Sequence, residues 1–108
     1  MRVLFDQGTP VPVRQHLLHH TVRTASQQGW ATFGNGELLA VAETEGFDVF
    51  VTTDKNLRYQ QDLSSRRVAI VVVMDAQWPR LEPYVDRIVT AVDKPTPGSY
   101  TEVEIPAT

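Results

Sequence analysis

The chain has 108 residues, of which 13 are acidic and 10 are basic, so its formal net charge is −3. Its apolar content of 42% and charged content of 21% are ordinary for a globular domain that buries its own core, which argues against disorder. It has no cysteine and no apolar stretch near the roughly 18 residues that a membrane-spanning helix needs. This composition excludes disulfides, thiolate metal sites, a cysteine nucleophile and a membrane protein.

Short apolar runs alternate with helical segments along the chain. In chain order we expect a strand over 2–5, a helix over 11–18, a strand over 21–24, a helix over 35–46, a strand over 47–52, a short helix over 55–63, a strand over 68–74, a helix over 79–92 and an edge strand over 100–105. The second helix is capped by Asn35, and the last one opens at Pro79.

This order of elements predicts the fold class. Strands that alternate with helices indicate an α/β fold, a three-layer α/β/α sandwich around a mainly parallel central sheet. The run 68–74 is almost continuously aliphatic, as expected of a central strand that is buried on both faces. We expect a single domain over 1–108 in which 95–108 forms a C-terminal tail or edge strand.

The N-terminal sequence and the charges bear on location and partners. Asp6 interrupts the first apolar run, so we expect no secretory signal and a cytoplasmic protein. Residues 1–67 hold seven basic and seven acidic side chains, whereas residues 68–108 hold three basic and six acidic ones. The chain therefore lacks the basic surface of a static DNA-binding protein. A nuclease remains open, because acidic side chains also bind catalytic metal ions.

Acidic side chains follow two of the predicted strands. Asp6 comes directly after the first strand, and Asp54 follows the strand that ends near Thr52. If the strand order is 2-1-3-4, these two strands are neighbours at the point where the order reverses, and ligands bind there in open parallel sheets. Glu37 lies in the first turn of a helix that begins at the same edge, where a carboxylate is favoured. We expect the three carboxylates to converge.

Converging carboxylates predict a metal site. They repel one another unless a cation compensates, and hard oxygen ligands suit Mg²⁺ or Mn²⁺. Such an ion activates water for attack on phosphate and stabilises the developing negative charge. The predicted chemistry is phosphodiester hydrolysis, with Asp6, Glu37 and Asp54 as catalytic and metal-binding residues.

Polar side chains next to Asp54 are candidates for substrate binding. Lys55 and Arg58 would contact the phosphates of a nucleic-acid substrate, which positions the substrate without reading its sequence, and Asn56 would donate or accept a hydrogen bond. The competing interpretation is that these residues form a solvated helix face.

Three segments resemble the PIN-like domain family, in particular the small bacterial PIN-like ribonucleases of toxin–antitoxin type. They are Arg-Val-Leu-Phe-Asp over 2–6, Asn-Gly-Glu-Leu-Leu-Ala over 35–40 and Val-Thr-Thr-Asp-Lys-Asn over 51–56. The resemblance implies an α/β/α sandwich, cleavage of RNA with Mg²⁺ or Mn²⁺, and metal-binding acids at Asp6, Glu37 and Asp54. It also implies a cognate antitoxin protein as a partner.

The alternative is a catalytically degenerate PIN-like module that acts only by binding another protein. The family pattern has a further acid where this chain has Asn56, and Asp75 is the remaining candidate for that role. The acidic edge strand over 100–105 would then pair with a partner by β-augmentation. The sequence leaves open the RNA target, the antitoxin, the number of metal ions and the oligomeric state, a homodimer included.

Overall fold

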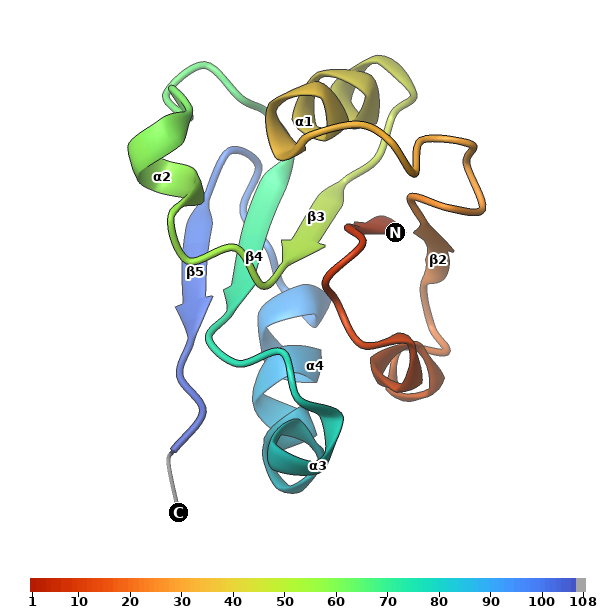
Figure 1. The fold of residues 1–108 in the computed structure, drawn as a ribbon, viewed down its shortest axis with the longest axis vertical. Coiled ribbons are helices and arrows are strands. Elements are labelled where there is room, and N and C mark those ends of the chain that lie inside the picture. Colours follow the sequence, from red (N-terminus) through yellow and green to blue (C-terminus); the bar gives the residue numbers. More distant parts are fainter. Residues whose placement is uncertain (107–108) are drawn as a thin grey trace.

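A parallel β-sheet forms the centre of the protein in a computed structural model that describes residues 1–106 (Figure 1). Within those residues the sheet has five strands in the order β2-β1-β3-β4-β5, and every neighbouring pair is parallel. The strands are β1 (Arg2–Phe5), β2 (Thr21–Thr24), β3 (Val49–Thr52), β4 (Ala69–Val73) and β5 (Tyr100–Val103). The predicted parallel α/β architecture is confirmed, and the order of the first four strands is the one on which the predicted site depends.

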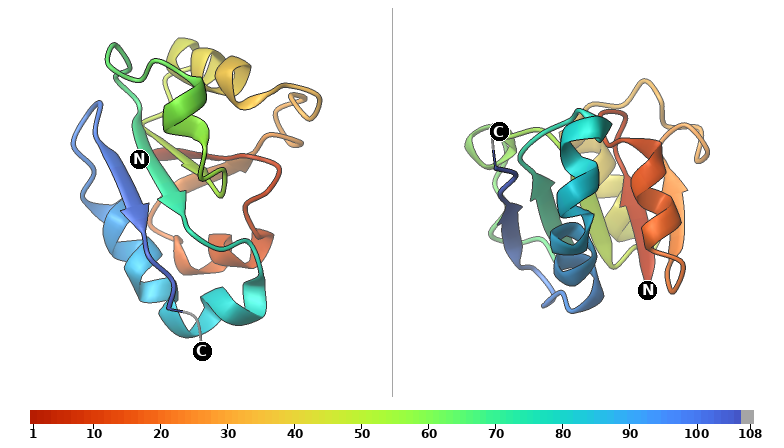
Figure 2. Two further views of the ribbon diagram at one scale, coloured as in Figure 1. Left: turned by 60° about the vertical axis from the view of Figure 1, so that its left-hand side comes forward. Right: turned by 90° about the horizontal axis from the view of Figure 1, so that it is seen from below.

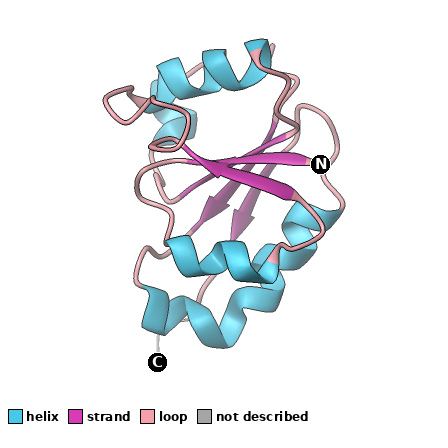
Figure 3. Cartoon of the chain, turned by 90° about the vertical axis from the view of Figure 1, so that its right-hand side faces the viewer, coloured by secondary structure: helices cyan, strands magenta, loops and turns pink. Residues whose placement is uncertain are grey.

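Helices cover both faces of the sheet, which gives the molecule three layers (Figures 2 and 3). One face carries α1 (Asn35–Thr44) and α2 (Leu57–Gln60). The other face carries the 3₁₀ segments η1 (Val11–His16) and η2 (Glu82–Tyr84) and the helices α3 (Trp78–Leu81) and α4 (Val85–Asp93).

Alternation of side chains along the central strands builds a core on each face. Val3 and Phe5 of β1 pack in one cluster with Ile88 of α4, whereas Leu4 packs in the other with Leu39 of α1. All positions of β4 are buried, and successive residues join opposite clusters. The continuous aliphatic run of this strand therefore reflects burial on both faces, as in parallel sheets generally.

Several predicted helices are shorter or more broken than their patterns indicate. The segment predicted over 11–18 is a 3₁₀ helix that ends at His16, and the one predicted over 55–63 is the single turn of α2. The helix predicted from Pro79 begins at Trp78 and is interrupted by the 3₁₀ turn η2. Pro83 lies in that turn, and proline lacks the N–H that a continuous α-helix would need.

The C-terminal segment contains the predicted edge strand. β5 pairs with β4, and its Val103 joins the core, so the segment predicted as a tail or edge strand is a strand over its central part. The last two residues of that segment, 107–108, lie outside the described residues. Across residues 1–106, none of the helices is both long enough and apolar enough to span a bilayer.

Two glycines with positive φ provide a matched test of the connection between α4 and β5. Gly98 has φ 74°, and a Cβ there would lie 2.7 Å from the carbonyl oxygen of Arg66. Gly29 has φ 80°, and a Cβ there would meet nothing within 4 Å. Gly29→Ala should lower the free energy of unfolding by about 1–2 kcal/mol, the cost of a left-handed backbone. Gly98→Ala should cost about 1–3 kcal/mol more, because the new methyl also overpacks the site. Equal losses in urea unfolding would contradict this assignment.

Candidate functional site

The candidate site lies where the strand order of the sheet reverses. β1 has β2 on one side and β3 on the other, and the pairing of Phe5 with Val51 brings the carboxyl ends of β1 and β3 together. The N–H of Asp6 donates to the carbonyl oxygen of Val51 at 3.1 Å, which continues the ladder one residue further. In open parallel sheets this switch point is where ligands bind.

The hydroxyl of Thr52 connects the two predicted aspartates. Thr52 is fully buried at the end of β3. Its Oγ1 donates to Oδ2 of Asp6 and accepts from the backbone N–H of Asp54 at 3.0 Å. Because one hydroxyl makes both bonds, the position of the Asp6 carboxylate is coupled to the turn that carries Asp54.

Asp6 both organises the turn after β1 and keeps acceptor capacity. The residue is 7% exposed, and its Oδ1 accepts from the N–H of Gly8 at 3.1 Å and from the N–H and hydroxyl of Thr9 at 3.0 and 2.7 Å. Its Oδ2 accepts from the hydroxyl of Thr52. An ionised carboxylate offers about four lone-pair positions, two on each oxygen, so Oδ2 has room for one further partner.

Asp54 is half-buried and bridges to the start of α1. Its Oδ2 accepts from Nδ2 of Asn35 at 3.0 Å, and its Oδ1 accepts from the N–H of Asn56 at 3.0 Å. The prediction that Asn35 caps α1 is wrong: the helix includes Asn35, and Gly34 occupies the cap position. The amide of Asn35 reaches the Asp54 carboxylate instead, so Asn35 belongs to the site.

Glu37 stabilises the N-terminus of α1 through a hydrogen bond to the backbone. Its side chain is exposed, and its Oε1 accepts from the N–H of Gly34 at 3.3 Å, which is the half of a capping box that a glycine cap permits. Among residues 1–106, no group of three or more acidic or histidine side chains is arranged to hold a metal ion. The structure therefore brings Asp6 and Asp54 to one place, while the convergence of Glu37 with them stays a prediction.

The residues at the switch point fit a hard divalent cation. Mg²⁺ is typically held by one or two carboxylates and keeps several waters, rather than being caged by protein ligands. Asp6 and Asp54 provide carboxylate oxygens, and the side chain of Asn35 lies against the second of them. This donor set contains no sulfur or imidazole, as Mg²⁺ and Mn²⁺ favour.

The predicted substrate-binding residues lie just beyond Asp54. Lys55 and Asn56 are exposed in the turn between β3 and α2, and the N–H of Asn56 is held by Asp54. Arg58 is exposed on α2, where its guanidinium lies 3.5 Å from Oε2 of Glu102 and over the ring of Tyr59. The side chain of Arg58, one of the predicted substrate-binding residues, therefore contacts β5.

The two residues that follow Asp6, Gln7 and Gly8, have structural roles that the sequence pattern did not predict. Gln7 donates from Nε2 to the carbonyl oxygen of Ala31 at 3.0 Å and accepts from the hydroxyl of Ser26 at 3.2 Å, which ties the loop before α1 to the site. A Cβ at Gly8 would lie 2.7 Å from Oγ1 of Thr53, so glycine permits this close packing of the two turns. In the sequence, the Gln-Gly pair after Asp6 is the only sign of these hydrogen bonds and of this close packing.

Asp75 is bound by Arg80 and by the backbone of its own turn. It follows β4, and its oxygens pair with the guanidinium of Arg80 at 2.7 and 3.0 Å and accept from the N–H of Gln77 at 2.9 Å. The hydrogen bond from Arg80, followed by the one from Gln77, holds the pKa of Asp75 below its ordinary value. Asp75 is thus a partner of Arg80.

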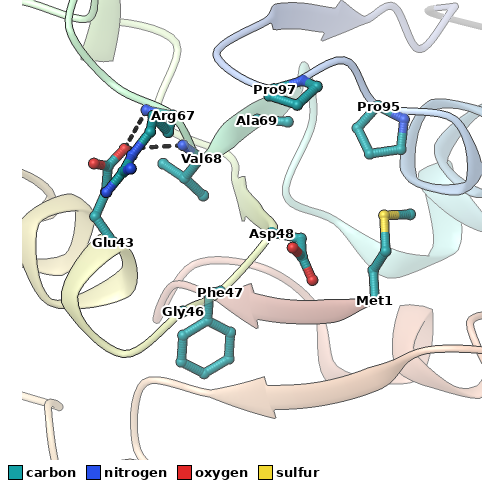
Figure 4. A pocket seen from close by; sticks show the side chains of 10 residues that line it. All are labelled: Met1, Glu43, Gly46, Phe47, Asp48, Arg67, Val68, Ala69, Pro95 and Pro97. Atoms are coloured by element: carbon teal, nitrogen blue, oxygen red, sulfur yellow. Dashed lines mark hydrogen bonds between the residues drawn. The ribbon is translucent and has the colours of Figure 1, made fainter.

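A hollow of about 330 Å³ lies at the opposite edge of the sheet, at the amino ends of β3 and β4 (Figure 4). Its lining residues are Met1, Glu43, Gly46, Phe47, Asp48, Arg67, Val68, Ala69, Pro95 and Pro97. Oε1 of Glu43 accepts from the N–H of Val68 at 2.9 Å and from that of Arg67. Partial burial raises the pKa of Glu43, but these backbone bonds together with the charges of Arg66 and Arg67 outweigh it and leave the pKa below its ordinary value. Glu43 therefore anchors the start of β4.

The bridging hydroxyl can be tested by two substitutions of Thr52. Thr52→Val keeps the shape of the side chain but leaves a buried carboxylate oxygen and a backbone N–H each without one partner. It should lower the free energy of unfolding by about 1–3 kcal/mol. Thr52→Ser keeps the hydroxyl and should lose only about 0.8 kcal/mol for the missing methyl. Chemical denaturation checks this, and a valine variant as stable as the serine variant would refute the bridge.

Comparisons with known proteins identify no relative. A scan against protein-family models found no match, and neither did searches of curated proteins and of solved structures. The fold and the arrangement of Asp6, Thr52 and Asp54 are therefore the basis for a functional assignment.

Proposed function

We propose that this protein is a metal-dependent endoribonuclease of PIN-like fold and the toxin component of a toxin–antitoxin pair. The observation that carries the proposal is the pair of aspartates, Asp6 and Asp54, at the ends of neighbouring parallel strands and joined through the hydroxyl of Thr52. Both aspartates lie at the switch point of the sheet, and ligands bind at this point in open parallel α/β folds.

Each residue at the switch point has a distinct task in this proposal. Asp6 and Asp54 hold Mg²⁺ or Mn²⁺, and Glu37 becomes a third ligand when its carboxylate releases the N–H of Gly34 and turns toward the ion. Asn35 orients the Asp54 carboxylate by donating to its Oδ2. When bound, the ion supplies a nucleophile from water and stabilises negative charge on the phosphate.

RNA reaches the site along the turn that follows β3. Lys55 and Asn56 are exposed immediately after Asp54, so a cation and an amide border the proposed metal position. Contacts from such side chains to phosphate oxygens fix the register of a nucleic acid without reading its sequence. Arg58, one turn further on, extends this positive border toward β5.

A PIN-like module without catalytic activity is the second candidate. All three acids already accept hydrogen bonds inside the protein, and Asn56 stands where the family pattern has a further acid. Such a module would act through a partner protein. The cleavage experiment below separates the two candidates.

The nuclease proposal predicts RNA cleavage by the purified protein in Mn²⁺. Cleavage should stop in EDTA. Asp54→Asn should slow it by at least about 10- to 100-fold, the loss caused by removing even an outer partner of a metal ligand. Asp86→Asn is the matched control, because that acid is exposed on α4, on the other face of the sheet, and its substitution should leave the rate unchanged. Cleavage that survives both EDTA and Asp54→Asn would contradict the assignment, and no cleavage in Mn²⁺ would favour the inactive module.

Metal binding itself predicts a gain in stability. An ion that binds only the folded state stabilises it by about 2.7 kcal/mol at a concentration of 100 times Kd. Mn²⁺ should therefore raise Tm of the unmodified protein, and both Asp6→Asn and Asp54→Asn should reduce the gain. Asp54 is the less buried of the two, so its variant keeps the test valid if Asp6→Asn does not fold. A gain of the same size in both variants would show that Mn²⁺ binds elsewhere.

A further inference from the structure

Tyr59 of α2 presents an aromatic ring to solvent. Its exposed fraction is 72%, while Leu57 of the same turn is completely buried and fixes the turn against the core. The other Phe, Tyr and Trp side chains within residues 1–106 are buried or half-buried. Leu57 already anchors this turn, so the packing of the core does not require the exposed ring of Tyr59.

The guanidinium of Arg58 holds this ring in place. It lies 4.7 Å from the ring centroid, and its Nη2 donates to the hydroxyl of Tyr59 at 2.5 Å. Its Nη1 lies 3.5 Å from Oε2 of Glu102, which also accepts from the hydroxyl of Tyr100 at 3.0 Å. Arg58 thus connects the ring to β5, and the exposure of Tyr59 leaves ring surface open to a ligand.

The Tyr100 side of this contact is stable across the physiological pH range. Burial, together with the hydrogen bond and charge of Glu102, raises the pKa of Tyr100 to about 12. The Tyr100 hydroxyl therefore stays protonated at neutral pH and continues to donate to Glu102.

The ring lies a short distance along the chain from Asp54. The N–H of Leu57 donates to the carbonyl oxygen of Asp54 at 3.2 Å, and the N–H of Tyr59 to that of Asn56 at 3.0 Å, so this segment is wound into turns. With a rise of about 1.5–2 Å per residue, it spans roughly 8–10 Å. Bases stacked along one strand repeat at about 3.4 Å, so this span is on the order of two to three nucleotides. In Figure 1 the loop that leaves β3 passes β4 and leads to α2, which lies beside β5.

We infer that Tyr59, backed by Arg58, is a stacking platform for an unpaired base of single-stranded RNA whose backbone passes Lys55 on its way to Asp54. This inference rests on the proposed nuclease function and adds to it a preference for unpaired RNA. An aromatic face stacks any base, and a neighbouring cation attracts the phosphates. A base within a duplex is already stacked on its neighbours and does not reach such a ring.

Binding of a fluorescein-labelled, mixed-sequence RNA 12-mer, followed by anisotropy in EDTA at low salt, tests the platform without any cleavage. Tyr59→Ala should weaken binding of the single strand by roughly 5- to 150-fold, the range for loss of one stacked base. Tyr59→Phe keeps the ring and should stay close to the unmodified protein. Tyr84→Ala is the matched control, because Arg87 lies over that ring at 5.2 Å but on the other face of the sheet, and it should have no effect.

The outcomes separate the platform from the nuclease. Equal affinities of the unmodified protein and Tyr59→Ala, equal losses in Tyr59→Ala and Tyr84→Ala, or equal binding of a blunt duplex of the same sequence would each overturn the inference. Tyr59-dependent binding without cleavage in Mn²⁺ would support the platform and contradict the nuclease. Cleavage in Mn²⁺ by Tyr59→Ala at an unchanged KM would support the nuclease and overturn the platform.

Discussion

The buried hydroxyl of Thr52 is the contact on which the arrangement at the switch point depends. It donates to the Asp6 carboxylate and accepts from the Asp54 backbone, so the ends of β1 and β3 share one hydrogen-bonding group. Leaving a buried polar group without a partner costs free energy of folding. Conformations that break either hydrogen bond of the Thr52 hydroxyl are therefore disfavoured. The turn after β1, the turn before α2 and, through Asn35, the start of α1 are all tied to it.

The same hydrogen bonds bear on how a metal ion would be held. Oδ1 of Asp6 is occupied by the turn it stabilises, whereas its Oδ2 and the Asp54 carboxylate keep acceptor capacity. A cation with several water ligands needs few protein oxygens, and two carboxylates at neighbouring strand ends provide them. Under the proposed function, Lys55 and Arg58 are the cations that contact the incoming phosphate.

Much of the fold could be predicted from the sequence, because it follows from periodicity. The aliphatic run of β4 and the strand-end positions of Asp6 and Asp54 depend on burial and strand direction, which the residue pattern records. The roles of Asn35 and Glu37 could not be separated this way. Either can cap a helix start, and the choice depends on which side chain can reach Asp54 in the folded protein.

The exposed ring of Tyr59 escaped prediction for a related reason. In the sequence it is one aromatic residue in a polar helix, and only the packing of Leu57 decides which side of the turn faces solvent. Its contact with Arg58 is between neighbouring residues, whereas the contact of Arg58 with Glu102 joins segments far apart in the chain. Long-range contacts of this kind carry no local sequence pattern.

The most direct test of the account is the location of bound Mn²⁺ by paramagnetic broadening in ¹H–¹⁵N NMR spectra of the intact protein. Substoichiometric Mn²⁺ should broaden first the amides that donate to the two aspartates, those of Gly8, Thr9 and Asn56. The amides of Asp48 and Val68, at the opposite edge of the sheet, should stay sharp. Broadening that begins at the opposite edge, or that spares the amides around Asp6 and Asp54, would contradict a metal site at the switch point.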